Sequence, residues 1–427
     1  MNEKLYLPRL IDNEIEDRLL WKGAVCVEGP KWCGKTCSCT QHSKSSFFVG
    51  SPEGNFNNRT LAKENPMLAL SGNPPHLIDE WQEVPGLWDA VRIEVDKRGG
   101  SGYFILTGSS TPKAKGILHS GTGRITKLKM RSMSLFESKE SSGRVSLQSL
   151  FDGTFSDQMT GNVDIMDVAF WIIRGGWPGM LGFGEKEAMQ NAKDYISSFL
   201  EDELPRLDDE RTYRDVRKVR FLLESLARNE STTVKISKLA SDISFATDIS
   251  IKEETVNEYL EILKRCFLAE EQEAFSFSVR SKTRLKKAPK RHLADPSLAA
   301  GLLSLSSKKL INDLETFGFL FEALVERDLD IYARTLGGTL FHYQDYGNKE
   351  IDAVLELEDG RWGAFEIKLG TSQIEKAAEN LLTINQKIRE DNIDNAPSFL
   401  AVISGLSNAA YKRKDGVYVL PISSLKP

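Results

Sequence analysis

The stretch VCVEGPKWCGKT, from Val25 to Thr36, decides the fold. It begins as an apolar run and ends in the pattern GxxxxGKT, whose glycines let backbone amides curl around phosphate oxygens. Lys35 can reach the β and γ phosphates, Thr36 can offer a hydroxyl to magnesium, and a helix beginning near Lys35 adds its positive N-terminal end. A glycine turn that matches by chance is the alternative, and the strand-like run before it disfavours that. The stretch therefore predicts a nucleotide site formed by Gly29, Pro30, Lys31, Trp32, Cys33, Gly34, Lys35 and Thr36.

A second apolar run, which starts at His76, ends in the carboxylates Asp79 and Glu80. Such a strand is the second half of an ATPase site: Asp79 is predicted to support the magnesium ion and Glu80 to act as the general base that polarises the attacking water. A surface acidic pair is the weaker alternative beside a complete phosphate loop. ATP and Mg²⁺ are therefore the predicted cofactors, with Thr36 and Asp79 as the magnesium residues.

Two further sets of residues are candidates for the same site. Thr107 and Ser109 follow an apolar strand, and small hydroxyls at the carboxyl end of a parallel strand lie beside the nucleotide crevice. Either can orient water or contact the γ phosphate, and the sequence does not separate them. Arg124 is a candidate arginine finger toward its own or a neighbouring subunit's γ phosphate. A solvated loop arginine is an equal alternative.

Length and composition set wider limits. The 427 residues predict two to four domains, and 40% hydrophobic with 27% charged residues is a globular composition. A net charge of −5 gives no overall basic signature, so a nucleic-acid surface has to be a local patch. No apolar run has the length of a membrane span and the charged start is unlike a signal peptide, so we expect a cytoplasmic protein without a membrane partner. The five cysteines lack paired CxxC spacing, which favours small buried residues over zinc ligands; Cys33 stays a candidate for oxidation.

The middle of the chain is helical. Apolar residues recur at helical spacing from Asp167 to Asp209, with a break at Gly175–Pro178, and again in three short segments after Asp215, followed by a strand-like run at Phe267–Glu270. Three helices and a strand suggest a winged helix-turn-helix. The basic run Arg280–Arg291 can hold a phosphate backbone or be a solvated linker. The candidate recognition helix at 252–258 is acidic, which argues against major-groove binding and favours a structural or protein-contact role.

A second group of charged residues lies near the C-terminus. Glu322 is on an apolar helix, Asp352 is in one alternating stretch, and Glu366 and Lys368 are in the next. Alternation suggests neighbouring strands on which Asp352 and Glu366 meet, with Lys368 on the same face as Glu366. Carboxylates and a lysine can hold magnesium and orient water toward a phosphodiester. Exposed charges on a sheet face are the alternative.

Motifs spread over nearly the whole chain carry a family resemblance. Together they resemble the AAA-type (AAA_14-like) bacterial and archaeal ATPases with a C-terminal DUF4143 region. The motifs are the phosphate loop, Leu77–Pro85, Leu106–Ser110, Met133–Glu137, Gly175–Pro178, Pro289–Asp295, Phe321–Glu322 and Phe365–Lys368.

This resemblance implies an AAA-like core, a helical lid, a winged-helix-like segment and a nuclease-like terminal domain. The last of these is similar to the PD-(D/E)xK nuclease core. Glu322 then matches its helical acid, Asp352 its first strand acid, and Glu366 with Lys368 its ExK motif. Since such domains often keep the fold after losing catalysis, the resemblance implies a possible metal site at Glu322, Asp352 and Glu366 but does not settle its activity.

The sequence thus predicts an α/β protein: a P-loop AAA-like parallel sheet with a helical lid, then a winged helix-turn-helix and a PD-(D/E)xK-like α/β domain. The expected domains are 1–138, 139–210, 211–280 and 281–427. The expected function is a Mg²⁺-dependent ATPase that couples hydrolysis to binding or processing of DNA or RNA, with homo-oligomerisation an open possibility. The rival is a nucleotide-dependent switch whose degenerate terminal domain is a protein-binding scaffold. A third possibility is ATP binding without turnover.

Overall fold

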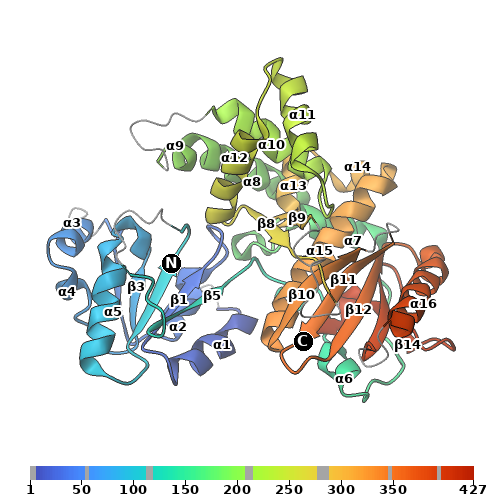
Figure 1. The fold of residues 1–427 in the computed structure, drawn as a ribbon, viewed down its shortest axis with the longest axis horizontal. Helices are drawn as coiled ribbons and strands as arrows, with labels where there is room; N and C mark the ends of the chain where they lie inside the picture. Colours follow the sequence, from blue (N-terminus) through green and yellow to red (C-terminus); the bar gives the residue numbers. More distant parts are fainter. Residues whose placement is uncertain are drawn as a thin grey trace. The chain divides into compact units, whose positions relative to one another are not determined.

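The structure is a computed structural model, and it describes residues 6–52, 57–111, 119–206, 215–276, 288–344, 349–391 and 396–427. By packing, the chain divides into two units, each described here by itself (Figure 1). Unit 1 comprises Met1–Ser132, Trp177–Gly179 and Ile262–Leu268, and unit 2 comprises Met133–Gly176, Met180–Glu261 and Ala269–Pro427.

Unit 1 is built on a parallel sheet of strand order β2-β3-β4-β1-β5. The central strands β1 and β4 are buried along their whole length, because helices cover both faces of a parallel sheet. This confirms the predicted α/β fold with a parallel P-loop sheet. The strands are β1 (Ala24–Glu28), β2 (Ser45–Phe48), β3 (His76–Asp79), β4 (Phe104–Gly108) and β5 (Ile125–Lys129), and the helices are α1 (Leu10–Leu19), α2 (Lys35–Gln41), α3 (Asn57–Glu64), α4 (Pro66–Ala69), η1 (Trp81–Glu83) and α5 (Gly86–Arg98).

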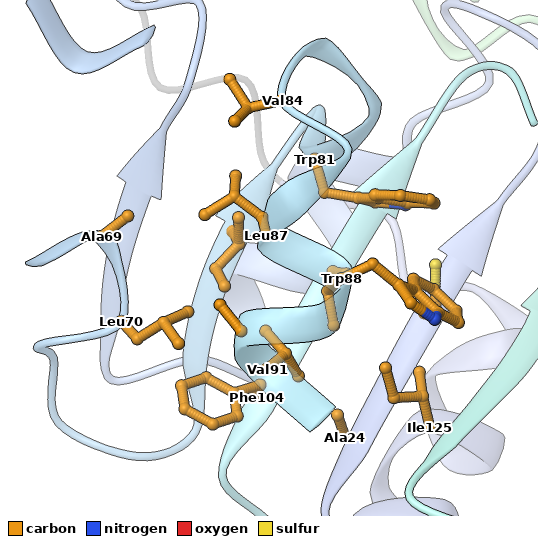
Figure 2. Packing of buried hydrophobic residues seen from close by; sticks show 14 of the residues in the cluster. Ala24, Ala69, Leu70, Trp81, Val84, Leu87, Trp88, Val91, Phe104 and Ile125 are labelled. Carbon is orange, nitrogen blue, oxygen red and sulfur yellow. The ribbon is translucent and has the colours of Figure 1, made fainter. Parts of the chain in front are cut away.

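The core of unit 1 fixes the turn that follows β3. The rings of Trp81 and Trp88 lie with their centroids 4.7 Å apart, and both side chains are buried. Leu87 and Val91 extend from the same face of α5 toward the sheet (Figure 2). Burying side chains of this size contributes about 1.5–3 kcal/mol each. Because Trp81 directly follows Glu80, this packing also anchors the backbone of a predicted site residue.

Unit 2 begins with helices and short strands. The helix α7 buries one apolar face and ends at a glycine with φ 67°, Gly175. The elements are β6 (Val145–Ser146), α6 (Leu147–Phe151), β7 (Gln158–Met159), α7 (Ile165–Arg174), η2 (Pro178–Met180, partly in unit 1), α8 (Glu185–Ser198), the π-helix η3 (Phe199–Glu203), α9 (Leu204–Arg206), α10 (Val216–Arg228), α11 (Ile236–Thr247), α12 (Glu253–Arg265, ending in unit 1), β8 (Ala269–Gln272), β9 (Lys290–Leu293), α13 (Pro296–Leu302) and α14 (Ser307–Asn312).

The second half of unit 2 is a mixed sheet of strand order β10-β11-β12-β13-β15-β14-β7. β10, β11 and β12 form an antiparallel meander, after which α16 crosses over to β13, parallel to β12. The elements are α15 (Leu314–Thr335), β10 (Gly338–Gln344), β11 (Glu350–Leu357), β12 (Trp362–Lys368), η4 (Thr371–Gln373), α16 (Ile374–Asp391), β13 (Phe399–Ser404), β14 (Ala409–Lys412), β15 (Tyr418–Pro421), η5 (Ile422–Ser424) and β16 (Leu425–Lys426).

The helical segments predicted after Asp215 are present as α10, α11 and α12, and they precede the antiparallel pair β8–β9. The strand predicted at Phe267–Glu270 starts two residues later, because Phe267 takes a left-handed φ of 55°. Within the described residues, no helix combines the length and the apolar character that crossing a bilayer requires.

Candidate functional site

The phosphate loop connects the buried strand β1 to the first turn of α2. Gly34 caps α2 with a φ of 103°, and a Cβ on Gly29 would lie 2.1 Å from the carbonyl oxygen of Met130. Both positions therefore require glycine, one for its conformation and one for a close backbone approach. These two constraints explain why the motif has glycine at both positions.

The Lys35 ammonium is buried within this loop. It donates to the carbonyl oxygens of Gly29, at 3.0 Å, and Pro30, at 2.8 Å, and only 4% of the residue is exposed. An ammonium has three N–H donors and forms stronger, charge-assisted bonds with phosphate oxygens than with neutral carbonyls. The Lys35 ammonium therefore lies inside the loop, and its contact with phosphate stays a prediction.

Asp79 lies beside the loop, at the end of β3. Its Oδ1 accepts hydrogen bonds from the hydroxyls of Thr36 and Thr107, both at 2.7 Å. Burial raises the pKa of Asp79 above its ordinary value, against the effect of these two hydroxyls. A hydroxyl and a carboxylate are oxygen donors of the kind that Mg²⁺ prefers, so Thr36 and Asp79 fit a magnesium ion.

Glu80 is held in a defined orientation. Its backbone has a left-handed φ of 56°, which costs a non-glycine residue about 1–2 kcal/mol, and its N–H donates to Thr107 Oγ1 at 3.0 Å. Its Oε2 accepts from Ser109 Oγ at 2.8 Å and from the side-chain amide of Gln82. The two hydroxyls that the sequence left unseparated therefore have different partners: Thr107 contacts both carboxylate residues, and Ser109 contacts Glu80.

Arg124 lies away from these residues. Its carbonyl oxygen accepts from the N–H of Ala24, at the amino end of β1, whereas the phosphate loop leaves the carboxyl end of that strand. Its guanidinium is 46% exposed and pairs with Asp96 at 2.8 Å. Arg124 is therefore not part of the site formed by its own phosphate loop, and a role toward a neighbouring subunit stays a prediction.

Residues outside the motifs also support the loop. Arg9 donates to the carbonyl oxygens of Cys33, at 2.8 Å, and Arg131, at 2.9 Å. Trp32 has a φ of 66° and stacks on the buried Trp177 at a centroid distance of 6.4 Å. The Cys33 side chain is fully buried, so the expectation of an oxidisable thiol does not fit its environment. Arg9 had no sequence signal, and Gln82 had none beyond lying inside the Leu77–Pro85 motif.

The C-terminal charged residues also come together, in unit 2. β11 and β12 are neighbouring strands, as predicted, and they run antiparallel. Lys368 Nζ lies 2.9 Å from Asp352 Oδ2 and 2.8 Å from Glu366 Oε2. The same Asp352 oxygen accepts from the N–H of Ile367 at 2.7 Å. Asn380 on α16 donates to the other oxygen of Glu366 at 2.7 Å.

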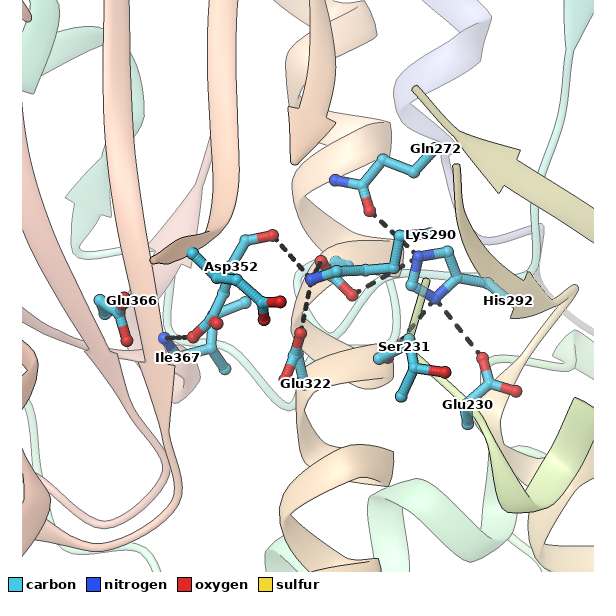
Figure 3. A network of polar contacts seen from close by, with 12 residues as sticks. Glu230, Ser231, Gln272, Lys290, His292, Glu322, Asp352, Glu366 and Ile367 are labelled. Carbon is cyan, nitrogen blue, oxygen red and sulfur yellow. Dashed lines mark hydrogen bonds and ion pairs between the residues drawn. The ribbon is translucent and has the colours of Figure 1, made fainter. Parts of the chain in front are cut away.

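Lys290, on β9, enters the same cluster from the other side (Figure 3). Its Nζ lies 2.6 Å from Glu322 Oε1 and 2.8 Å from Glu326 Oε1, and it donates to the carbonyl oxygen of Asp352 at 2.9 Å. Sequence reasoning missed both Lys290 and Glu326. The available signal was helical spacing, because Glu326 lies one turn after Glu322 on α15.

Burial dominates the electrostatics of this cluster. It raises the pKa of Glu322 to about 7, of Glu366 to about 7 and of Glu326 to about 8. Burial acts in the same direction on Asp352, but the ammonium groups of Lys368 and Lys290 outweigh it, and the pKa of Asp352 is lowered.

The predicted metal site does not fit these residues. Among the residues that the structure describes, no group of three or more His, Cys, Asp and Glu side chains is arranged to hold a metal ion. Glu322, Asp352 and Glu366 share one polar network, yet two lysine ammonium groups lie between their oxygens.

The end of the basic run also differs from expectation. Lys290 and Arg291 are buried, and Arg291 pairs with Glu271 at 3.2 Å and donates to the carbonyl oxygen of Val234. These two side chains are therefore not available to a phosphate backbone. Residues 280–287 of the run lie outside the described residues.

Three protein families match successive stretches of the chain. Residues 22–139 match the AAA domain family (AAA_14), residues 165–309 match a domain of unknown function (DUF8612), and residues 317–425 match another (DUF4143). Two uncharacterized proteins, from Mycobacterium tuberculosis and Mycobacterium bovis, are each 25% identical over 373 residues, which is 86% of this chain and 75% of theirs.

Two solved structures share weak overall similarity. The Aeropyrum pernix ORC1 protein, solved in complex with DNA, is 10% identical over 73% of this chain and 97% of that chain, with a TM-score of 0.23. A signal transduction ATPase with numerous domains from Pyrococcus horikoshii is 14% identical over 78% and 53%, with a TM-score of 0.22. TM-scores this low do not establish a shared overall fold. The family matches and the fold together identify an AAA-type P-loop ATPase domain near the N-terminus of this chain and a DUF4143 domain at its C-terminus.

Proposed function

We propose that unit 1 binds ATP with Mg²⁺ and hydrolyses it. The observation that carries this proposal is the convergence of Lys35, Thr36, Asp79, Glu80 and Thr107 at the carboxyl ends of β1, β3 and β4. Ligands of open α/β sheets bind at that edge.

Each residue has a distinct role in the proposal. Lys35 holds the phosphates, and Thr36 with Asp79 hold the magnesium ion, which when bound neutralises charge on the phosphate oxygens. Glu80 accepts a proton from the attacking water. Thr107 positions Asp79 and Glu80 relative to one another, since its hydroxyl bonds to both.

The Glu80 carboxylate has to face that water to act as a base. In the structure its Oε2 is engaged by Ser109 and Gln82. We infer that Ser109 and Gln82 fix the side-chain rotamer of Glu80, so that one carboxylate oxygen is committed to them and the other is directed to the water. This distinguishes Ser109, a positioning residue, from a direct γ-phosphate contact.

Phosphate release from ATP tests the hydrolase proposal. We expect turnover that requires Mg²⁺, is abolished by EDTA, and falls by more than tenfold in Lys35→Ala, while Lys31→Ala, an exposed position in the same loop, changes it less. ATP that binds but is not hydrolysed by the wild-type protein would leave the third possibility, binding without turnover.

For unit 2 we propose a binding role that the ATPase cycle controls, and not phosphodiester cleavage. The specific observation is the ammonium group of Lys290, a lysine outside the predicted nuclease motif, which lies between Glu322, Glu326 and the carbonyl oxygen of Asp352. The helices α10, α11 and α12 with β8 and β9 are compatible with a winged helix, but α12 starts with Glu253 and Glu254, which disfavours a nucleic-acid groove. We therefore favour a protein partner over DNA or RNA.

Two assays separate these outcomes. Incubation of plasmid and single-stranded DNA with Mg²⁺ or Mn²⁺, with and without ATP, should give no cutting; cutting that Asp352→Ala abolishes would refute the binding role and establish a nuclease. DNA affinity that falls steeply with added salt, and that Lys286→Ala with Lys287→Ala reduces, would restore nucleic acid as the partner.

A further inference from the structure

We propose that Lys290 is the resident cation of the C-terminal carboxylate cluster: its ammonium takes the place that a divalent metal ion would need, and the DUF4143 domain therefore forms its carboxylate cluster around a lysine from the preceding matched segment and binds no metal there. This inference rests on the binding role proposed for unit 2 and explains why the four charged residues that resemble a nuclease motif do not form a metal centre.

The coordination around Lys290 Nζ carries the proposal. Its three oxygen neighbours come from two different elements: Glu322 and Glu326 from α15, and the backbone carbonyl of Asp352 from β11. The three contacts are 2.6, 2.8 and 2.9 Å, and an ammonium has three N–H donors. All three donors are thus used, and Figure 3 shows the Lys290 side chain directed toward Glu322 and Asp352.

A divalent ion needs the same oxygens at shorter range. Magnesium binds oxygen ligands at about 2.0–2.1 Å in an octahedral arrangement, so it and the ammonium exclude one another. Three further carboxylate oxygens of the cluster also have partners: Asp352 Oδ2 accepts from Lys368 and from the N–H of Ile367, Glu366 Oε2 pairs with Lys368, and Glu366 Oε1 accepts from Asn380.

Lys290 lies on the paired strand β9 and is buried. β9 pairs with β8 in antiparallel register over four residues, and the N–H of Leu293 donates to both oxygens of the buried Glu230, at 3.1 and 3.2 Å. The chain after β8 continues into the core, where Phe275 packs against Phe341 and Trp362 at centroid distances of 5.7 and 5.4 Å. The lysine therefore belongs to the packed interior of unit 2.

The charge balance points the same way. Two ammonium groups lie among four carboxyl groups (Glu322, Glu326, Asp352 and Glu366), and burial raises the pKa of three of these (Glu322, Glu326 and Glu366) to about 7 or 8, which reduces the excess of negative charge. A buried charge is tolerated only when it is paired. A lysine on a buried strand provides that pairing from within the chain, whereas a metal ion would have to be acquired.

Mn²⁺ titration of the full chain without nucleotide tests the proposal. Lys290→Met removes the ammonium but keeps an unbranched apolar stem, and Lys376→Met is a matched control on the exposed face of α16. We expect Lys290→Met to bind one more Mn²⁺ per chain than the wild type or Lys376→Met, and adding Glu322→Gln to remove that extra site. Manganese should also raise the melting temperature of Lys290→Met more than that of the control.

Two results would overturn the proposal. One is a folded Lys290→Met that gains no Mn²⁺ site. The second result needs no Lys290 variant. We expect the wild-type protein and Glu322→Gln to bind the same number of Mn²⁺ ions, so a Mn²⁺ site that is lost in Glu322→Gln would show that the cluster already holds metal. Because nucleotide and DNA are absent from the titration, neither result depends on ATP hydrolysis or on the partner of unit 2.

Discussion

The substitution Thr107→Val probes the residue that joins the two halves of the ATPase site. Thr107 is fully buried, donates to Asp79 Oδ1 at 2.7 Å and accepts from the N–H of Glu80 at 3.0 Å. Valine keeps nearly the same shape and loses both hydrogen bonds. Asp79 retains its bond from Thr36, but the N–H of Glu80 is left without this partner.

The magnitude follows from these two bonds. A hydrogen bond to a charged group contributes about 1.5–3 kcal/mol, and an unpaired buried backbone group costs about 1–3 kcal/mol. Allowing for the bond that Asp79 keeps, we expect a loss of roughly 2–4 kcal/mol, which for a domain of this size lowers the melting temperature by roughly 6–12 °C. Phosphate release should fall by about 10- to 100-fold, because the metal residue and the base lose their common anchor.

Circular dichroism measures the change in melting temperature, and added ATP identifies the transition of unit 1 as the one that the ligand stabilises. A phosphate-release assay measures the change in turnover. Thr126→Val is the matched control, a half-buried threonine on the edge strand β5 of the same sheet. A Thr107→Val protein with the melting temperature and turnover of this control would refute the role given to the hydroxyl.

Three further predictions concern other parts of the chain. The Asp12 carboxylate beside His42 raises the pKa of that imidazole, so the pairing stabilises the fold below about pH 6.5 and is lost as pH rises through the raised pKa; the melting-temperature gap between wild type and His42→Gln should be largest below about pH 6.5 and should close as the pH rises above it. A Cβ on Gly176 would lie 2.1 Å from a backbone oxygen, so Gly176→Ala should melt well below Gly86→Ala, where a Cβ meets nothing within 4 Å; equal melting would contradict the packing. Arg124→Ala should leave turnover unchanged in dilute protein, and a loss that appears only at high protein concentration would establish a finger acting on a neighbour.

Local spacing made the candidate nucleotide site of unit 1 predictable. The phosphate loop and the strand that ends in Asp79 and Glu80 are contiguous motifs whose chemistry is written in neighbouring residues, and the parallel sheet brings them together as expected. What the sequence could not give was the partner of each hydroxyl. Thr107 and Ser109 are two residues apart and differ only in which carboxylate they face, which depends on strand order.

Burial of charge was the main feature that the sequence concealed. Lys290 stands at the end of a run of basic residues, where a solvated or phosphate-binding side chain is the usual expectation. It is instead buried against Glu322 and Glu326, more than 30 positions further along the chain. A run of basic residues does not indicate which of its side chains lies on a buried strand, as Lys290 does on β9. Packing likewise places Trp177–Gly179 and Ile262–Leu268 with unit 1, an arrangement that contiguous domain boundaries cannot express.

The most direct test of the central claim compares ATP binding and ATP hydrolysis in the same proteins. Equilibrium binding of a fluorescent ATP analogue and steady-state phosphate release should be measured for wild type, Glu80→Gln and Lys35→Ala. The account predicts that Glu80→Gln binds nucleotide about as tightly as wild type but releases phosphate at least about 100-fold more slowly, since it removes the base and keeps the phosphate contacts. Lys35→Ala should lose both. Phosphate release by Glu80→Gln at the wild-type rate would contradict the assignment of Glu80 and, with it, the catalytic site described for unit 1.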